Sequence, residues 1–262
     1  MFGDLAPRRR LLLVGGFVVV LLVVSFVVIL ARATTEGLSG PPVASTAAPG
    51  PIVIIPGYGG STTGPDALAS TLRRGGRDVT VVALPDGGIG DLTVQAHTLG
   101  HAVHAALGRS GAASVDLVGY SAGSIVARIF VQQEHGFSVV RRVVTFGAPN
   151  HGTDLAATAA DLVPGSCTDA CAQLQPSSSL LAALNGLPLQ VAFASLYTED
   201  DRTVTPPTSA VLQGAVNVDV QHVCPGLQVS HGGLPTNPHV QAIVAAELGT
   251  SPQSVPTTCP TT

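Results

Sequence analysis

The sequence predicts an α/β protein: a mostly parallel sheet with helices on both faces, preceded by one N-terminal transmembrane helix. From Pro51 onward, short runs rich in β-branched residues alternate with helical patterns, which is typical of a parallel sheet. One long apolar run near the N-terminus predicts the membrane helix. The 262 residues are 45% hydrophobic and 11% charged, with a formal net charge of −4. This composition excludes disordered and nucleic-acid-binding proteins, and no phosphate- or dinucleotide-binding motif predicts a cofactor.

The N-terminal run is long enough to span a bilayer. Arg8–Arg10 precede twenty uncharged, mostly aliphatic residues, Leu11–Leu30, which as a helix would extend about 30 Å. The arginines predict that residues 1–10 are cytoplasmic and that the remainder is outside the cell. Ala31-Arg32-Ala33 is also a candidate cleavage site, so the alternatives are a single-pass membrane anchor and a protein secreted after cleavage near Ala33.

Residues 31–50 are rich in Pro, Ala, Ser, Thr and Gly and predict a linker to a domain over 51–250, with a C-terminal tail over 251–262. Within the domain, 154–189 has no clear strand character and lies where a lid or cap over a pocket would be inserted. The expected strands are Ile52–Ile55, Val79–Leu84, Val115–Val118, Val139–Thr145, Val191–Tyr197 and Val216–Val223. The expected helices lie near Asp66–Arg74, Leu92–Leu107, Ser121–Glu134 and His239–Leu248.

Four cysteines suit an oxidising compartment and allow three pairings. The simplest pairing is a local Cys167–Cys171 bridge with Cys224–Cys259 holding the C-terminal tail. A zinc site is the alternative, but no C-x-x-C motif or nearby paired histidine supports it.

The most informative segment is Gly119-Tyr120-Ser121-Ala122-Gly123, which follows an expected strand and leads directly into a helical pattern. This order is the context of a nucleophile elbow, a sharp turn that lifts a serine hydroxyl clear of the sheet. Side chains at positions 119 and 123 would collide across such a turn, which explains both glycines. With 30 glycines in the chain the pentapeptide alone is weak, so the residues that would act with Ser121 decide its significance.

A serine becomes nucleophilic when an imidazole takes its proton, and an acid must fix the tautomer of that imidazole. The acid is expected after a late strand, where Glu199, Asp200 and Asp201 are adjacent. Asp201 is the preferred candidate and Asp200 the alternative.

Three histidines follow these acids: His222, His231 and His239. His222 falls within the last expected strand and His239 at the start of the closing helix. His231 lies in the loop between them, where the imidazole is needed, and is therefore the predicted base.

The oxyanion that forms when a serine attacks a carbonyl group needs two fixed hydrogen-bond donors. The backbone N–H of Ala122, directly after the serine, is one candidate. The other is the N–H of Tyr58, in the glycine-rich loop that follows Ile52–Ile55.

Five spaced motifs resemble bacterial α/β-hydrolase lipases of the triacylglycerol lipase/esterase group, over about residues 51–248. They are IVIIPGYGG, DLVGYSAG, TFGAPNHGT, YTEDDRTVTP and VSHGGLP. The resemblance implies an α/β-hydrolase fold, with Ser121 as nucleophile, His231 as base, Asp201 as orienting acid, and Tyr58 and Ala122 at the oxyanion.

One departure from these lipases concerns the loop after the first strand. They usually carry His-Gly where this chain has Pro56-Gly57, which leaves the positioning of the loop open. Within TFGAPNHGT, the resemblance predicts that His151 shapes the pocket wall and does not catalyse.

The expected function is an exported lipase or esterase that hydrolyses carboxylic esters, with acylglycerols as the favoured substrates and no metal or cofactor. The membrane contact would run through Leu11–Leu30, and neither a nucleic acid nor a protein partner is predicted. The alternatives are a cell-surface acyltransferase with the same triad and a binding protein that has the hydrolase fold without its activity.

Overall fold

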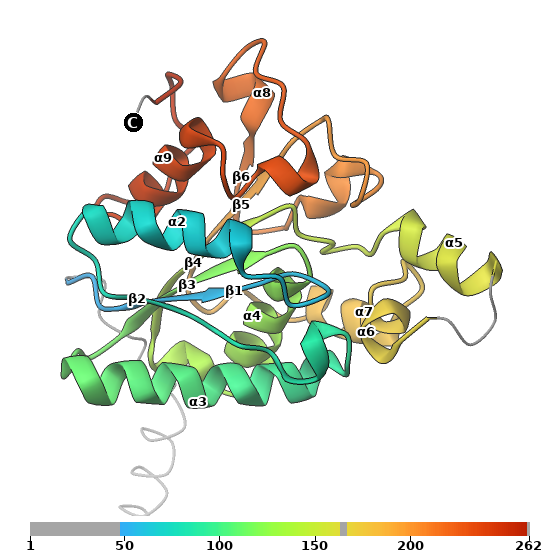
Figure 1. Ribbon diagram of the computed structural model, residues 1–262, viewed down its shortest axis with the longest axis horizontal. Coiled ribbons are helices and arrows are strands. Elements are labelled where there is room, and N and C mark those ends of the chain that lie inside the picture. The colour runs from blue at the N-terminus through green and yellow to red at the C-terminus, as the bar shows by residue number, and fades with distance from the viewer. Residues whose placement is uncertain (1–47, 163–166, 261–262) are drawn as a thin grey trace, which may run out of the picture. The chain divides into compact units, whose positions relative to one another are not determined.

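In the part of the chain that the structure describes, six short strands form one sheet in which every strand is parallel to its neighbours, in the order β2-β1-β3-β4-β5-β6 (Figure 1). The strands are β1 Ile52–Ile55, β2 Val79–Val81, β3 Val115–Tyr120, β4 Val140–Phe146, β5 Ala192–Tyr197 and β6 Val216–Asp219. All their carboxyl ends therefore lie at one edge of the sheet. The prediction of a mostly parallel sheet is confirmed.

The structure is a computed structural model and describes residues 48–162 and 167–260. The predicted membrane segment Leu11–Leu30 and most of the linker lie outside the described residues. Among the helices of the two described ranges, none combines the length and the apolar character needed to cross a bilayer.

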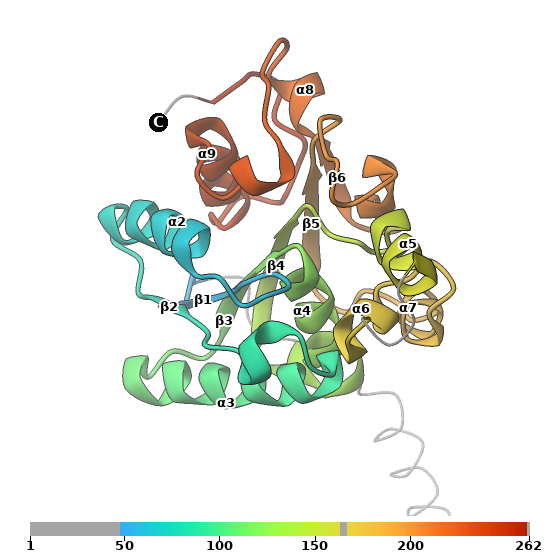
Figure 2. The ribbon, with the colours of Figure 1, turned by 45° about the vertical axis from the view of Figure 1, so that its right-hand side comes forward.

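Helices cover both faces of the sheet (Figures 1 and 2). One face packs against α2 and α9, and the other packs against α3 and α4. The side chains of β1 alternate between the two faces. Ile52 and Ile54 belong to the core on the side of α2 and α9, and Val53 and Ile55 belong to the core on the side of α3 and α4. The four helices are α2 Thr63–Arg74, α3 Leu92–Ser110, α4 Ala122–Gln133 and α9 Pro238–Glu247. A sheet buried on both faces explains why β1 is a continuous apolar run and why most residues of the other strands are apolar.

Within its described residues, the segment predicted as a lid contains three short helices, which lie to the right in Figure 1. They are α5 Asp154–Leu162, α6 Asp169–Gln173 and α7 Ser179–Asn185. Thr168 caps α6 by accepting from the N–H of Cys171, and Ser178 caps α7 in the same way, through the N–H of Leu181. Hydroxyl caps therefore begin both helices.

Both predicted disulfides are present, Cys167–Cys171 around the start of α6 and Cys224–Cys259 between a loop and the C-terminal segment. Among the described residues, one group of three metal-ligand side chains comes together, namely Cys224, His239 and Cys259. Its two sulfurs are bonded to each other and are not thiolates, so the disulfide replaces the zinc alternative.

The predicted strand Val216–Val223 was too long. Strand β6 ends at Asp219, whose carboxylate accepts from the N–H groups of Gln221 and His222 and so begins the short helix α8, Val220–Val223. His222 therefore lies in an exposed helical turn and not in a strand. The capping carboxylate outweighed the β-branched pattern of this run.

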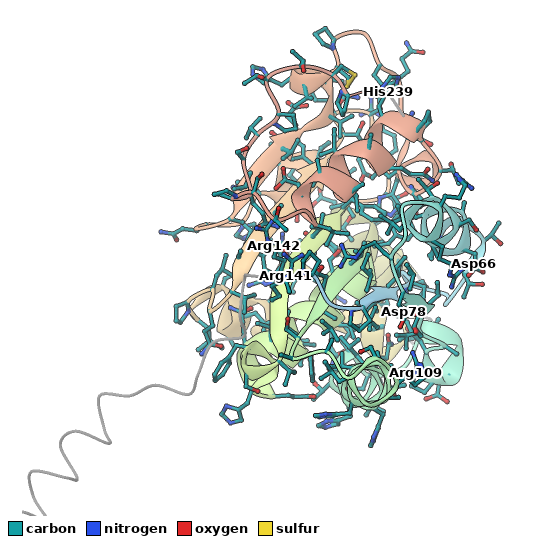
Figure 3. All side chains as sticks on the ribbon, turned by 90° about the vertical axis from the view of Figure 1, so that its left-hand side faces the viewer. Asp66, Asp78, Arg109, Arg141, Arg142 and His239 are labelled. Atoms are coloured by element: carbon teal, nitrogen blue, oxygen red, sulfur yellow. A yellow bond between two sulfur atoms is a disulfide. The ribbon has the colours of Figure 1, made fainter. Side chains whose placement is uncertain are left out.

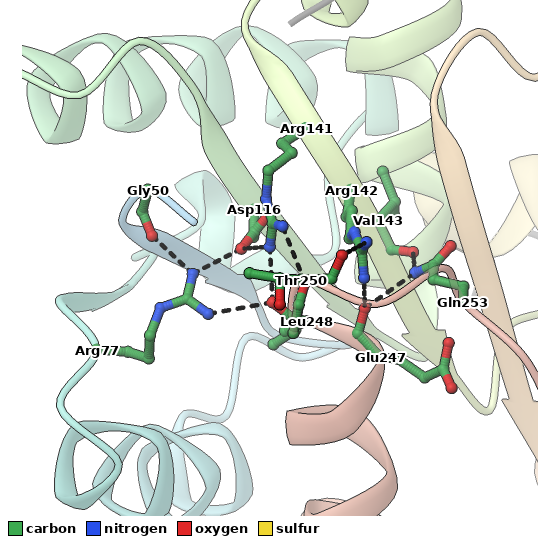
Figure 4. A network of polar contacts seen from close by, with 11 residues as sticks. Gly50, Arg77, Asp116, Arg141, Arg142, Val143, Glu247, Leu248, Thr250 and Gln253 are labelled. Atoms are coloured by element: carbon green, nitrogen blue, oxygen red, sulfur yellow. Dashed lines mark hydrogen bonds and ion pairs between the residues drawn. The ribbon is translucent and has the colours of Figure 1, made fainter. Parts of the chain in front are cut away.

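Arginines and a buried aspartate join the amino-terminal edge of the sheet to the end of α9 (Figure 4). Figure 3 labels two of these arginines, Arg141 and Arg142. Asp116, on β3, accepts from Arg141 at 2.7 and 2.6 Å and from Arg77 at 2.6 Å. Both arginines also donate to the carbonyl oxygen of Leu248, directly after α9. The Asp116 carboxylate thus accepts from both guanidinium groups, and the end of the closing helix is fixed to the starts of β3 and β4.

Arg142 extends this network toward β5. Its guanidinium donates to the carbonyl oxygens of Glu247 and Thr250 at 2.9 and 3.2 Å. The side-chain Oε2 of Glu247 is buried without a partner among the described residues. This edge of the sheet is therefore polar and rigidly connected, whereas the strands' carboxyl ends lie at the opposite edge.

Candidate active site

Ser121 lies between the end of β3 and the start of α4, with φ 52° and ψ −126°. A positive φ is strained for a residue other than glycine and is typical of functional turns. A Cβ at Gly119 would lie 2.6 Å from the Cα of Ser124, which is the expected collision across the turn. A Cβ at Gly123 would instead meet the carbonyl oxygen of Ile55 at the end of β1. Both glycines are required, but the reason predicted for Gly123 was wrong.

The structure brings Ser121, His231 and Asp201 together from three separate segments. His231 Nε2 lies 3.0 Å from Ser121 Oγ, and His231 Nδ1 lies 2.7 Å from Asp201 Oδ2. A carboxylate at Nδ1 favours the tautomer that carries its proton there, which leaves the Nε2 lone pair facing the hydroxyl. All three side chains are buried. The arrangement can therefore accept a proton from the serine hydroxyl.

The two adjacent aspartates have different partners. Asp201 Oδ1 accepts from the N–H groups of Thr203 and Val204, both at 2.8 Å, which orients Oδ2 toward the imidazole. Asp200 Oδ2 accepts from the N–H of Val229 and from Gln221 Nε2, both at 3.1 Å. Asp200 therefore holds the loop that leads to the histidine, and it is Asp201 that contacts the ring.

Sequence reasoning missed two residues that position the imidazole. Tyr120 donates to the carbonyl oxygen of His231 at 3.2 Å, and its ring centroid lies 5.2 Å from that of the histidine. Burial, together with the charge of Asp201, raises the pKa of Tyr120 to about 12, so its hydroxyl remains a neutral donor. Gly147 has φ 62°, and a Cβ there would lie 2.9 Å from His231 Cε1. Only a glycine leaves room for the ring in this position.

The loop after β1 packs against the serine. A Cβ at Gly57 would lie 2.9 Å from the Cβ of Ser121, so the backbone passes directly beside the hydroxyl. The backbone N–H of the next residue, Tyr58, makes no hydrogen bond within the described ranges. Ala122 is the first residue of α4, and the first N–H groups of a helix have no partner within it. The two predicted donors thus flank Ser121 with their N–H groups available.

An apolar cavity of about 230 Å³ opens beside Ser121. Side chains from the predicted lid form much of its wall, including Leu155 and Ala156 of α5 and Leu174 beyond α6. The complete lining is Tyr58, Ser121, Pro149, Thr153, Leu155, Ala156, Ala159, Cys171, Leu174, Thr203 and Val204. The cavity suits a hydrocarbon chain.

His151 does not belong to the lining of this cavity. Its Nε2 lies 3.1 Å from the carbonyl oxygen of Val211, and its Nδ1 lies 3.2 Å from Asn185 Nδ2. Pro149 and Thr153 of the same motif do line the cavity. His151 therefore supports the wall from outside by joining it to α7.

A second cavity, of about 360 Å³, shares Tyr58 with the first. Its wall carries hydroxyl groups and glycines and includes Tyr120, next to the serine. The complete lining is Gly57, Tyr58, Ser61, Thr63, Gly64, Pro65, Tyr120, Gly232, Pro235 and Thr236. Tyr58 therefore stands between an apolar space and a more polar one.

No protein-family model matches the chain, and no curated protein sequence matches it. Solved structures do match. Lipase B of Aspergillus fumigatus is 19% identical with a TM-score of 0.65, over 79% of this chain and 54% of that one. Bacillus licheniformis lipase BlEst2 in mature form is 21% identical with a TM-score of 0.60, over 80% of this chain and 95% of that one. Its propeptide form is 22% identical with a TM-score of 0.64, over 83% and 54%.

The chain thus has the α/β-hydrolase fold that these lipases share. It spans about half the length of the Aspergillus lipase chain and nearly all of mature BlEst2. At these identities the likeness shows the fold alone, so the chemistry must be argued from the site.

Proposed function

We propose that the chain is an exported serine ester hydrolase, a lipase or esterase that cleaves carboxylic esters and favours acylglycerols. The observation that carries the proposal is the unbroken series of hydrogen bonds from Asp201 through His231 to Ser121, which ends beside an apolar cavity. A buried serine, imidazole and carboxylate in this order generate a nucleophile without a metal.

In the first half of the reaction, Ser121 Oγ attacks the carbonyl carbon of the ester while His231 Nε2 takes its proton. The carbonyl oxygen becomes an oxyanion, to which the N–H groups of Tyr58 and Ala122 donate. His231 then passes the proton to the leaving alkoxide, the carbon–oxygen bond breaks, and the alcohol departs from an acyl-serine.

In the second half, water takes the place of the alcohol. His231 removes one proton from water as the water oxygen attacks the acyl carbon, and the same two N–H groups donate to the second oxyanion. The bond to Ser121 Oγ then breaks, the proton returns to that oxygen, and the carboxylic acid leaves. Asp201 remains ionised and stabilises the imidazolium in both halves.

The two cavities suit the two parts of an ester. We assign the acyl chain to the apolar cavity, because its lining offers hydrocarbon contact beside Ser121. The alcohol part then belongs in the cavity with the hydroxyl groups of Ser61, Thr63 and Thr236. A glycerol moiety, with its own hydroxyl and ester oxygens, matches that lining.

The proposal includes a location outside the cytoplasm, with Leu11–Leu30 as an anchor or, after cleavage near Ala33, a secreted form. Two disulfides in the described part of the chain support an oxidising compartment. Mature protein recovered from membranes with Leu11–Leu30 intact would support the anchor, and mature protein starting after Ala33 would support secretion.

The decisive experiment compares wild type with Ser121→Ala on a chain-length series of p-nitrophenyl esters and on an emulsified triglyceride. Wild type should hydrolyse the esters and react once with a fluorophosphonate probe, whereas Ser121→Ala should do neither. Equal labelling of the two proteins would refute the nucleophile. No labelling of wild type would favour the binding protein.

An acyltransferase is a second candidate, because the hydroxyl-lined cavity could hold an acceptor alcohol in place of water. Adding glycerol or a sugar to the ester assay separates the two reactions. Transesterified product that forms much faster than free acid would favour the transferase.

A further inference from the structure

We infer that Thr168 is a positioning residue for the oxyanion-binding loop: its hydroxyl holds Tyr58, and helix α6 with its disulfide holds Thr168. The inference rests on the proposed function, since it concerns how the Tyr58 N–H is kept beside Ser121. The Cys167–Cys171 segment would then have two roles: it contributes to the cavity wall, and it positions the loop that carries Tyr58.

The contact joins two segments that are far apart in the sequence. Tyr58 Oη lies 3.1 Å from Thr168 Oγ1, across a separation of 110 residues. The Tyr58 side chain is large and apolar, yet 47% of the residue is exposed. Among the described residues, Thr168 is the one side-chain hydrogen-bond partner of this half-exposed tyrosine. This bond therefore limits how far the loop can move.

Thr168 is itself held in place. It caps α6 through the N–H of Cys171, and the disulfide from Cys167 to Cys171 closes the chain around it. The disulfide links the residues on either side of Thr168 and so limits the conformations open to this turn. The hydroxyl of Thr168 thus has a fixed position from which to bond Tyr58.

Helix α6 is in turn attached to the body of the fold at the start of α3. Gln173 accepts from the N–H of Leu92 at 2.8 Å and donates to Asp91 at 2.7 Å. The N–H of Ala170 donates to the carbonyl oxygen of Ile89 at 3.2 Å. A continuous set of bonds therefore runs from α3 through α6 and Thr168 to the loop beside the serine.

Loss of the Tyr58–Thr168 bond should act on the reaction in two ways. The Tyr58 N–H would spend less time where the oxyanion forms, which lowers kcat, because oxyanion donors act only when already in place. The ring would also cease to separate the two cavities, which should weaken the preference between short and long acyl chains. We expect a threefold to tenfold loss of kcat, less than the roughly 100-fold or greater loss that removing a donor outright causes.

The test is a double-mutant cycle of Tyr58→Phe and Thr168→Val in the full chain, assayed on p-nitrophenyl esters of several chain lengths. Each single variant should lower kcat threefold to tenfold, and the double variant should be no worse than either one. Thr168→Ser keeps a hydroxyl and should restore kcat. Tyr58→Phe keeps the ring and should leave the melting temperature near that of wild type.

Ser178→Ala is the matched control, because it removes an equivalent hydroxyl cap from α7 that does not touch Tyr58. Its kcat and chain-length preference should equal those of wild type. Multiplicative losses in the double variant, no rescue by Thr168→Ser, or an equal loss in Ser178→Ala would each overturn the inference. If wild type hydrolyses the esters and both single variants have the same kcat as wild type, the inference is overturned but the proposed function is not. Absence of any turnover by wild type overturns the proposed function and the inference with it.

Discussion

Exchanging each of two neighbouring aspartates for asparagine should have very different effects on catalysis. In Asp201→Asn, the new side chain has one carbonyl oxygen and one NH₂ group. The N–H groups of Thr203 and Val204 both need an acceptor where Oδ1 now lies, so the carbonyl oxygen should take that position. The NH₂ group then faces His231 Nδ1, which can only accept from it.

This rotamer forces the proton of His231 onto Nε2, the atom that must accept the serine proton. The wrong tautomer cannot act as a base, and in serine hydrolases this exchange lowers kcat about 10⁴-fold. We expect a loss of that order for Asp201→Asn. The structure of the variant should change little, since both backbone bonds survive.

Asp200→Asn should be mild, because the two bonds that Asp200 accepts converge on Oδ2. An amide oxygen at that position keeps both, to Val229 and Gln221. We expect kcat to fall by no more than about threefold, corresponding to less than 1 kcal/mol in the barrier.

The assay is kcat on a p-nitrophenyl ester at pH 7–8, with circular dichroism and melting temperature to show that both variants are folded. Similar losses in the two folded variants would refute the assignment of separate roles. So would an Asp201→Asn variant that keeps a tenth of wild-type kcat.

Three further changes test other parts of the structure. Gly147→Ala places a methyl group against the His231 ring and should lower kcat about 100-fold in steady-state assays, with a loss of about 1–2 kcal/mol in unfolding free energy. Asp116→Ala leaves two arginines without their carboxylate, so urea unfolding should show a loss of about 3–5 kcal/mol, while kcat of the folded protein stays unchanged. Burial raises the pKa of Glu247, so ionisation opposes folding. Glu247→Gln should therefore increase stability at pH 7. In melting experiments the gain should shrink as pH falls through the raised pKa of Glu247 and be absent below about 4.3, the ordinary value, whereas a constant gain would contradict this cause.

The fold and the candidate triad could be predicted from sequence because each depends on local patterns or on chain order. The apolar runs predicted the positions of the strands. The turn between β3 and α4 requires glycines within a few residues of Ser121, so the motif is local in sequence. His231 was predicted from its place after Asp201, since a parallel sheet brings successive strand ends to one edge. These patterns can be recognised in the sequence without knowledge of any tertiary contact.

The supporting residues could not be predicted, because their roles depend on tertiary contacts. Gly147 follows β4 like many strand-ending glycines, and only the position of the His231 ring shows why it must be glycine. Asp200 and Asp201 have the same chemistry, and their roles differ by the direction in which each carboxylate points. The error at His222 was local instead: Asp219 is a good capping residue, and its signal was present but was outweighed by the valines around it.

The departure at Pro56-Gly57 from the lipases that the sequence resembles has a physical interpretation. A proline fixes φ at position 56, and Gly57 allows the backbone to lie against Ser121, so the entry to the loop is rigid without a histidine. Beyond that point, Gly59 and Gly60 both have positive φ, and the N–H of Gly60 closes the turn by donating to the carbonyl oxygen of Gly57 at 3.0 Å. The bond from Tyr58 to Thr168 adds a restraint within this turn from a segment outside the loop. The double variant Pro56→Ala with Thr168→Val should therefore lose more kcat than the product of the two single losses. The reason is that each single variant still has one of the two restraints on the loop, whereas the double variant has neither.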